Sequence, residues 1–134
     1  MDSQAVLIDT SLFIEHIRAR DKAGTLFARV HARHHRLVTS SIVAAELCCG
    51  ARSQAARVDV MTLLSITRII PFTETMAFRL SPEAERLKAR NAMIGFRDLA
   101  IARVALEECL PVATHNQREF NRVPGLQLFD LAAV

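Results

Sequence analysis

The sequence predicts an α/β fold, a three-layer α/β/α sandwich built on a central, mostly parallel sheet of five strands. Short apolar runs alternate along the chain with longer amphipathic stretches, which is the pattern of strands joined by crossover helices. The length of 134 residues corresponds to a single domain over residues 1–134, because domains commonly contain about 100–200 residues.

The first half of the chain predicts two strands and four helices. Ala5-Val6-Leu7-Ile8 is uninterrupted and apolar, as expected of a strand buried on both faces. Hydroxyl side chains at Thr10 and at Ser40 or Ser41 favour helix starts. The expected elements are a strand at 5–8, helices at 10–20 and 23–35, a strand at 36–39, and helices at 40–51 and 55–65.

The second half predicts three more strands. Ser81-Pro82 falls inside a helical pattern and predicts a break or restart there, because proline cannot donate the helical hydrogen bond. The Pro124-Gly125 turn precedes a weak last strand. The expected elements are a strand at 68–71, a helix at 74–90, a loop at 91–95, a helix at 97–109, and strands at 111–114 and 127–129.

Composition excludes several classes of protein. With 51% hydrophobic and 23% charged residues, the chain is neither disordered nor collagen-like. No apolar run approaches the ~18 residues of a membrane helix. The opening residues, Met1-Asp2-Ser3-Gln4, lack the basic start of a signal peptide, so we expect a cytoplasmic protein. Cys48, Cys49 and Cys109 form no metal or redox spacing and are expected to be small buried side chains in a reducing compartment.

The basic residues are biased toward arginine. The net charge is +3, and 15 of the 17 basic residues are arginine. Because the guanidinium fork matches phosphate geometry, this bias is consistent with a nucleic-acid partner. Arginine-rich codon usage explains it equally well.

Oxygen-bearing side chains occur at places that a parallel sheet brings together. Asp9 follows the first strand, Glu46 lies on an apolar helix face, Asp98 begins the helix before the fourth strand, and Asn116 follows that strand. Each has a structural alternative: a helix cap for Asp9, an ion pair with an arginine for Glu46, and a favourable helix-dipole position for Asp98. Asn116 with Glu119 resembles a capping box.

The coincidence of these positions favours a metal site. Ligand sites of open α/β sheets lie at the carboxyl ends of the strands, where most of these residues are expected. Several hard oxygen ligands in one pocket suit Mg²⁺ or Mn²⁺. Such a metal activates water and stabilises charge on a phosphodiester.

Four motifs in this order carry a resemblance to a known family. They are Leu7-Ile8-Asp9-Thr10-Ser11; Thr39-Ser40-Ser41-Ile42 leading to Glu46-Leu47-Cys48-Cys49-Gly50; Ile94-Gly95-Phe96-Arg97-Asp98-Leu99-Ala100-Ile101-Ala102; and Thr114-His115-Asn116-Gln117-Arg118-Glu119-Phe120. With them the chain resembles the PIN-domain ribonucleases, specifically the VapC-type toxins of bacterial toxin–antitoxin pairs. The resemblance spans nearly the whole chain and implies a PIN-like sandwich.

The resemblance also implies a function. A VapC-type toxin is a Mg²⁺- or Mn²⁺-dependent endoribonuclease that attacks structured RNA such as tRNA or rRNA. It forms a homodimer and is held inactive by a cognate VapB-type antitoxin. Asp9, Glu46 and Asp98 fall on the family's acidic positions, and Asn116 falls on a fourth position that is Asp or Asn. The family often ends in an acidic-Trp pair, where this chain has Phe129-Asp130.

Roles follow for individual residues as a hypothesis. Asp9 and Asp98 hold the metal with help from Glu46, which also accepts a proton from the attacking water. Asn116 supports a second metal or positions water. Thr10, Ser11 and Thr114 orient the carboxylates, and Arg97 contacts RNA phosphate. The apolar patterns of the first two helices and of residues 55–65 are expected to form a groove for an antitoxin peptide.

Other functions remain as alternatives. A receiver domain needs paired acids at the first strand, and a haloacid-dehalogenase-type phosphatase needs Asp where Ser11 stands, so both are disfavoured. A non-catalytic RNA- or protein-binding module and a DNA-directed nuclease of the same fold stay open. His31, His34 and His35 have the spacing of a metal site on one helical face, but the same spacing is typical of a solvated surface.

Overall fold

The computed structural model describes residues 4–134, so the expectation drawn from the opening residues 1–3 lies outside the described part. Its centre is a parallel sheet of strands β1 (Ala5–Ile8), β2 (Arg36–Ser40), β3 (Arg68–Ile70) and β4 (Val112–Ala113). The strand order is β3-β2-β1-β4, and every neighbouring pair is parallel. The chain therefore builds outward from β1 in one direction and then returns to its other side.

The predicted fifth strand is wrong. Residues 127–129 form only an isolated bridge, Val112 to Leu128, held by two backbone hydrogen bonds of 2.8 and 2.9 Å. The pairing ends there because β4 itself has two residues and because Asp130 accepts a hydrogen bond from Ala132 that starts a 3-10 turn. The sheet over residues 4–134 thus has four strands.

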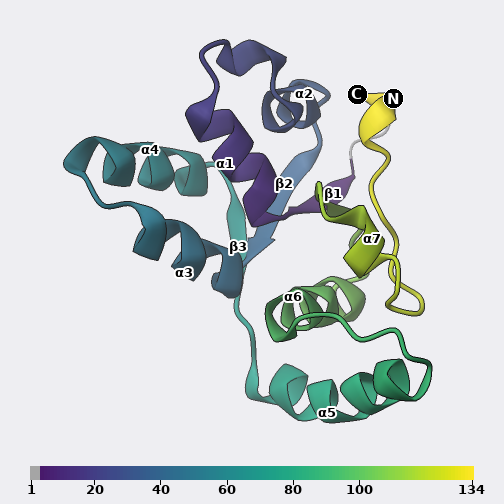
Figure 1. The fold of residues 1–134 in the computed structure, drawn as a ribbon. Helices are drawn as coiled ribbons and strands as arrows, with labels where there is room; N and C mark the ends of the chain where they lie inside the picture. Colours follow the sequence, from purple (N-terminus) through teal and green to yellow (C-terminus); the bar gives the residue numbers. More distant parts are fainter. Residues whose placement is uncertain (1–3) are drawn as a thin grey trace.

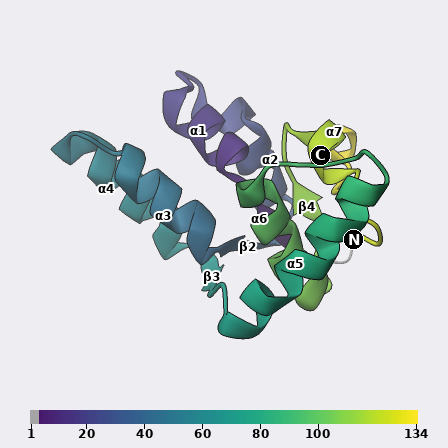
Figure 2. The ribbon, with the colours of Figure 1, turned by 60° about the horizontal axis from the view of Figure 1, so that its bottom comes forward.

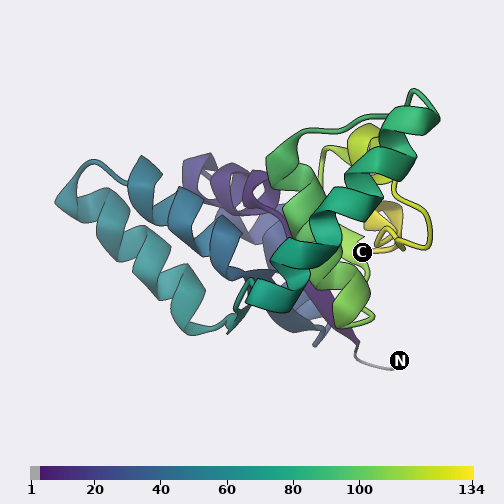
Figure 3. The ribbon, with the colours of Figure 1, turned by 90° about the horizontal axis from the view of Figure 1, so that it is seen from below.

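The helices cover both faces of the sheet. Figure 1 shows α1 and α2 on one side and α5 with α6 on the other, while α3 and α4 form a hairpin that projects sideways. Figures 2 and 3 show the same three groups from other directions. The helices are α1 (Thr10–Arg18), α2 (Leu26–Ala32), α3 (Ser41–Gly50), α4 (Gln54–Ser65), α5 (Glu74–Ala89), α6 (Phe96–Glu107) and α7 (Gln117–Phe120), with 3-10 turns at Lys22–Gly24 and Leu131–Ala133.

Two predicted helices differ from those observed. The helix expected over 23–35 is a 3-10 turn followed by α2, which ends at Ala32 because His34 adopts a left-handed conformation with φ of 62°. His31, His34 and His35 therefore do not share a helical face. Conversely, α5 continues through Pro82 without the predicted break. Pro82 is exposed, so water can replace the missing donor on that side of the helix.

The cysteine prediction is also wrong. Cys48, Cys49 and Cys109 are exposed free thiols. The first two lie on the outer side of the last turn of α3, and Cys109 occupies a left-handed turn just beyond α6, with φ of 55°. In the described part of the chain, no helix has both the length and the apolar character needed to cross a bilayer.

The core fixes the elements that carry the site. Val6, Leu7 and Ile8 of β1 are fully buried, and so are Ala100–Ala102 of α6. The small side chains of Ala100 and Ala102 allow close packing, and they hold the start of α6 in place below the sheet. The first turn of α6 is therefore placed rigidly next to the carboxyl ends of the strands.

Candidate metal site

The site lies where the strand order reverses. β1 and β4 are neighbours in the sheet although they lie over 100 residues apart in sequence. Asp9 directly follows β1 and Thr114 directly follows β4, and the Asp9 amide donates to the Ala113 carbonyl at 3.0 Å. Reversal points of this kind are the usual ligand sites of open α/β sheets.

Two cap positions at this edge, Asp9 and Asn116, do not use their side chains for capping. Thr25, Ser40, Ser53 and Thr73 each cap a helix with a hydroxyl that accepts a backbone hydrogen bond. Asp9 and Asn116 occupy the same cap position before α1 and α7 but make no side-chain cap bond. Their alternative reading as helix caps is thus contradicted, and their oxygens and amide face the site.

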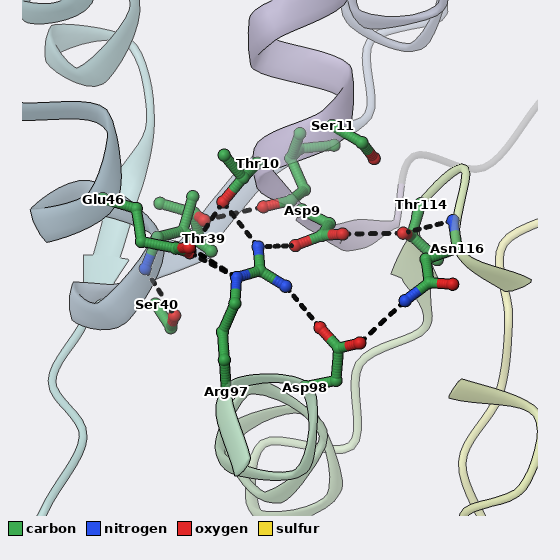
Figure 4. Close-up of polar contacts among 12 residues, drawn as sticks. Asp9, Thr10, Ser11, Thr39, Ser40, Glu46, Arg97, Asp98, Thr114 and Asn116 are labelled. Carbon is green, nitrogen blue, oxygen red and sulfur yellow. Dashed lines mark hydrogen bonds and ion pairs between the residues drawn. The ribbon is translucent and has the colours of Figure 1, made fainter. Parts of the chain in front are cut away.

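The guanidinium of Arg97 lies at the centre of the cluster, as Figure 4 shows. Its Nε donates to both carboxylate oxygens of Glu46 at 2.6 Å. Its Nη2 donates to Asp9 Oδ1 at 2.8 Å and to Thr10 Oγ1 at 2.7 Å. Its Nη1 pairs with Asp98 Oδ1. One arginine from α6 thereby links three carboxylates from three different elements.

Hydroxyl and amide groups hold the remaining carboxylate oxygens. Thr114 donates to Asp9 Oδ2 at 2.7 Å and accepts from the Asn116 amide at 2.9 Å. The Asn116 side-chain amide donates to Asp98 Oδ2 at 2.7 Å. Thr10 donates to Glu46 Oε1 at 3.0 Å. Thr10 and Thr114 thus contact the carboxylates that they are expected to orient.

Ser11 has a different position. Its hydroxyl accepts from the backbone amide of His115 at 3.1 Å, and Figure 4 shows it pointing away from the carboxylates. It ties the start of α1 to the segment after β4. The expected carboxylate-orienting role of Ser11 is therefore replaced by a structural one.

The site holds buried charges of both signs. The Asp9 side chain is 3% exposed and that of Asp98 13%, whereas those of Glu46 and Arg97 are about one third exposed, at 35% and 34%. Burial raises the pKa of the Asp98 carboxyl, and the charge of Asp9 adds to this while Arg97 opposes it. Burial alone lowers the pKa of Arg97, but its bonds to Glu46 and the charge of Asp9 outweigh burial and raise it. Arg97 is therefore a permanent cation.

The donor set fits a divalent cation. Three carboxylates and an amide side chain supply hard oxygens of the type that Mg²⁺ and Mn²⁺ prefer. The guanidinium shows that the cluster already accommodates a positive charge. Within residues 4–134, no group of three or more His, Cys, Asp or Glu side chains is arranged to hold a metal as it stands. Between the three carboxylates lies the guanidinium of Arg97 (Figure 4).

Sequence reasoning missed two features of this region. Arg97 is expected to contact the substrate, but it forms the ion pair with Glu46 that the sequence offers as the structural alternative, and it also joins Asp9 and Asp98. Glu15 also joins α1 to its surroundings, because it accepts from the Leu26 amide at 3.0 Å and contacts His115 Nε2 at 2.8 Å. No sequence pattern pairs Glu15 with His115, since they are 100 residues apart.

Comparison with known proteins identifies the fold family. The PIN domain family model matches residues 6–126. Ribonuclease VapC10 of Mycobacterium tuberculosis is 31% identical over 118 residues, which cover 86% of this chain and 85% of that protein. Ribonuclease VapC2 of Rickettsia felis is 28% identical over 128 residues, covering 91% and 94%.

A solved structure agrees with this assignment. The structure of VapBC-1 from nontypeable Haemophilus influenzae matches with a TM-score of 0.79 and 30% identity, covering 96% of this chain and 98% of that one. The two chains therefore share the fold over nearly all of their lengths. The chain belongs to the PIN domain family, and the relatives that it resembles are VapC ribonucleases.

Proposed function

We propose that this protein is a Mg²⁺- or Mn²⁺-dependent endoribonuclease toxin that acts in the cytoplasm on structured RNA, tRNA or rRNA. The observation that carries the proposal is the convergence of Asp9, Glu46, Asp98 and Asn116 from four separate elements around one cation. The names of the curated relatives support ribonuclease activity. We further propose that residues 1–134 form a single PIN domain.

The proposed roles of the three carboxylates follow from their burial. Asp9 and Asp98 hold the metal, because they are the most buried carboxylates of the cluster, and Glu46 completes the site from α3. A divalent metal bound there lowers the pKa of water and stabilises negative charge on a phosphodiester. Glu46, the most exposed of the three carboxylates, accepts the proton of the attacking water.

Neutral groups keep these carboxylates in place. Thr114 and Thr10 orient Asp9 and Glu46, and Asn116 orients Asp98 through its amide. In-line attack by water on phosphorus leaves a 5′-phosphate and a 3′-hydroxyl. Arg97, the arginine that contacts these carboxylates, provides the cation for an RNA phosphate.

A VapB-type antitoxin is the proposed protein partner. VapBC proteins are toxin–antitoxin systems. A groove of about 190 Å³ runs between α1, α3 and α4 and is lined mainly by apolar side chains. Glu46 forms part of this lining, so a peptide in the groove ends beside the carboxylates and blocks them. The lining residues are Ile14, Ile17, Arg18, Glu46, Leu47, Gly50, Ala51, Ala56 and Val60. This agrees with the groove expected for the first helix and residues 55–65, although α2 takes no part.

The test is cleavage of total cellular RNA by purified, antitoxin-free protein, read at single-nucleotide resolution. We expect discrete cuts with Mg²⁺ or Mn²⁺ and none with chelator. Asp98→Asn should lower the cleavage rate by more than about 100-fold, because loss of a group behind a metal ligand already costs about 10–100-fold. Exposed Asp59 on α4 provides the matched control, and Asp59→Asn should cleave like the unmodified protein.

Several outcomes would contradict the proposal. Folded protein that leaves RNA intact in both metals would favour a non-catalytic binding module. Faster cleavage of single-stranded or duplex DNA, assayed beside RNA, would favour a DNA-directed nuclease. Products with a 2′,3′-cyclic phosphate would exclude attack by water. Circular dichroism confirms that each variant is folded, since the chain has no Trp or Tyr for fluorescence.

A further inference from the structure

We propose that Arg97 is an internal competitor of the metal, so that its guanidinium must leave the carboxylates before a divalent cation enters. The inference rests on the proposed metal-dependent function and concerns how this chain controls access to the site. The carboxylate oxygens of the cluster already accept hydrogen bonds.

Every carboxylate oxygen of the cluster has a partner. Arg97 donates hydrogen bonds to one oxygen each of Asp9 and Asp98 and to both oxygens of Glu46. Thr114 donates to the other oxygen of Asp9, and Asn116 donates to the other oxygen of Asp98. Asp9, Asp98 and Glu46 would hold a divalent cation through carboxylate oxygens, and four of their six oxygens are bound to the guanidinium. Metal and Arg97 therefore cannot bind the same oxygens at once.

Arg97 can also move its side chain away from the carboxylates. Its side chain is 34% exposed, whereas that of Asp9 is 3% exposed. It projects from the first turn of α6, directly after Gly95 and the exposed Phe96. Rotation of its side-chain torsions releases the guanidinium toward solvent while the backbone of α6 stays fixed by its buried alanines. The buried carboxylates have no comparable freedom.

This exchange has two consequences. In the metal-free protein, Arg97 neutralises carboxylates that would otherwise repel one another in a partly buried site. A guanidinium released from the carboxylates would be free to contact an RNA phosphate. The apparent metal affinity is reduced by the fraction of molecules in which Arg97 occupies the cluster.

Metal binding to the full chain tests the competition directly. Dissociation constants for Mn²⁺ are measured by electron paramagnetic resonance, without RNA, for the unmodified protein and for Arg97→Gln and Arg97→Lys. We expect Arg97→Gln to bind Mn²⁺ roughly tenfold more tightly or better. Arg97→Lys should fall between, because lysine keeps the charge but lacks the fork that bridges several carboxylates.

Arg79→Gln controls for the change in net charge. Arg79 lies on α5 and pairs with Glu107 of α6, outside the cluster, so its loss should change the Mn²⁺ constant by less than about twofold. A second measurement uses the unmodified protein alone. The ¹⁵N resonance of Arg97 Nε should shift, and its proton should exchange faster with water, as Mg²⁺ saturates the site.

The outcomes separate the two proposals. If the unmodified protein binds Mn²⁺ and Arg97→Gln binds it no more tightly, competition is refuted while the metal site stands. An Arg97 Nε resonance that is unchanged at saturating Mg²⁺ refutes competition as well, even if the glutamine variant does not fold. If none of the proteins binds Mn²⁺, both the metal site and the competition are refuted.

Discussion

Thr114 shows how one hydroxyl supports the site. It is fully buried, donates to Asp9 Oδ2 and accepts from the Asn116 amide. Valine has nearly the same shape but supplies neither bond, so two buried polar groups would lose their partner. The site thus depends on a residue that touches no substrate.

Thr114→Val is therefore expected to lower both stability and activity. The free energy of unfolding should fall by about 1–3 kcal/mol, the usual cost of a buried group left without a partner. Cleavage should weaken because Asp9 loses its orientation. Urea titration followed by circular dichroism measures the first effect. Exposed Thr62 bonds only to its own helix, so Thr62→Val is the control. Equal stability of both variants would contradict this account of Thr114.

At the scale of elements, the sequence predicts the strands and helix starts that depend on neighbouring residues alone. The run at residues 5–8 became β1, because a strand buried on both faces admits only apolar side chains. The cap predicted at Ser40 or Ser41 is Ser40, and α1 begins at Thr10 as predicted, although Asp9 is its cap residue. The fifth strand and the break at Pro82 were wrong, because each depends on tertiary context: the length of β4 and the exposure of one helix face. The topology of the sheet predicts that four side chains lie close together, those of Asp9, Glu46, Asp98 and Asn116. The contacts of Arg97 depend on its side-chain torsions, which the sequence pattern does not predict.

The contact between α1 and α2 makes stability depend on pH. His16 of α1 hydrogen-bonds Thr25, the cap of α2, at 2.7 Å, and its ring packs against Phe27. Burial lowers the pKa of His16 below the ordinary 6.5, and the nearby charge of Lys22 adds to this. The folded state therefore binds the proton less readily than the unfolded chain does. The corresponding stability is complete above pH 6.5 and is lost as the pH falls through the lowered value.

We expect the free energy of unfolding of His16→Gln to fall less on acidification than that of the unmodified protein. The free energy of unfolding is measured in urea at pH 7.5 and 5.5, and the difference between the two should be smaller in this variant than in the unmodified protein. Other titrating groups contribute equally to both proteins and cancel. His31→Gln, at an exposed position of α2, should keep the full difference. If both variants show the same loss on acidification, His16 is not the group responsible.

At the scale of the molecule, the apolar surface is unevenly distributed. Phe78 near the start of α5 is 71% exposed; Met93 and Phe96, at 58% and 75%, lie at the other end of the α5–α6 pair, because Arg79 beside Phe78 pairs with Glu107 at the end of α6. Aromatic side chains at such exposure are typical of protein interfaces. A second exposed group lies near α4 and contains Val58, Met61 and Ile66. We propose that the surface around Phe78 of α5 forms a homodimer interface, because it exposes a large aromatic side chain and the α4 group has none.

A single charge should then separate the subunits. We expect the unmodified protein to have twice the chain mass of 14.9 kDa in light scattering, and Phe78→Asp to have the mass of one chain. An aspartate in the centre of an apolar interface loses its hydration without gaining a partner, so association weakens by several orders of magnitude. Met61→Asp places the same charge on the α4 group and should leave the dimer intact. Dissociation by Met61→Asp instead would move the interface to α4, and an unmodified protein with the mass of one chain would exclude the dimer.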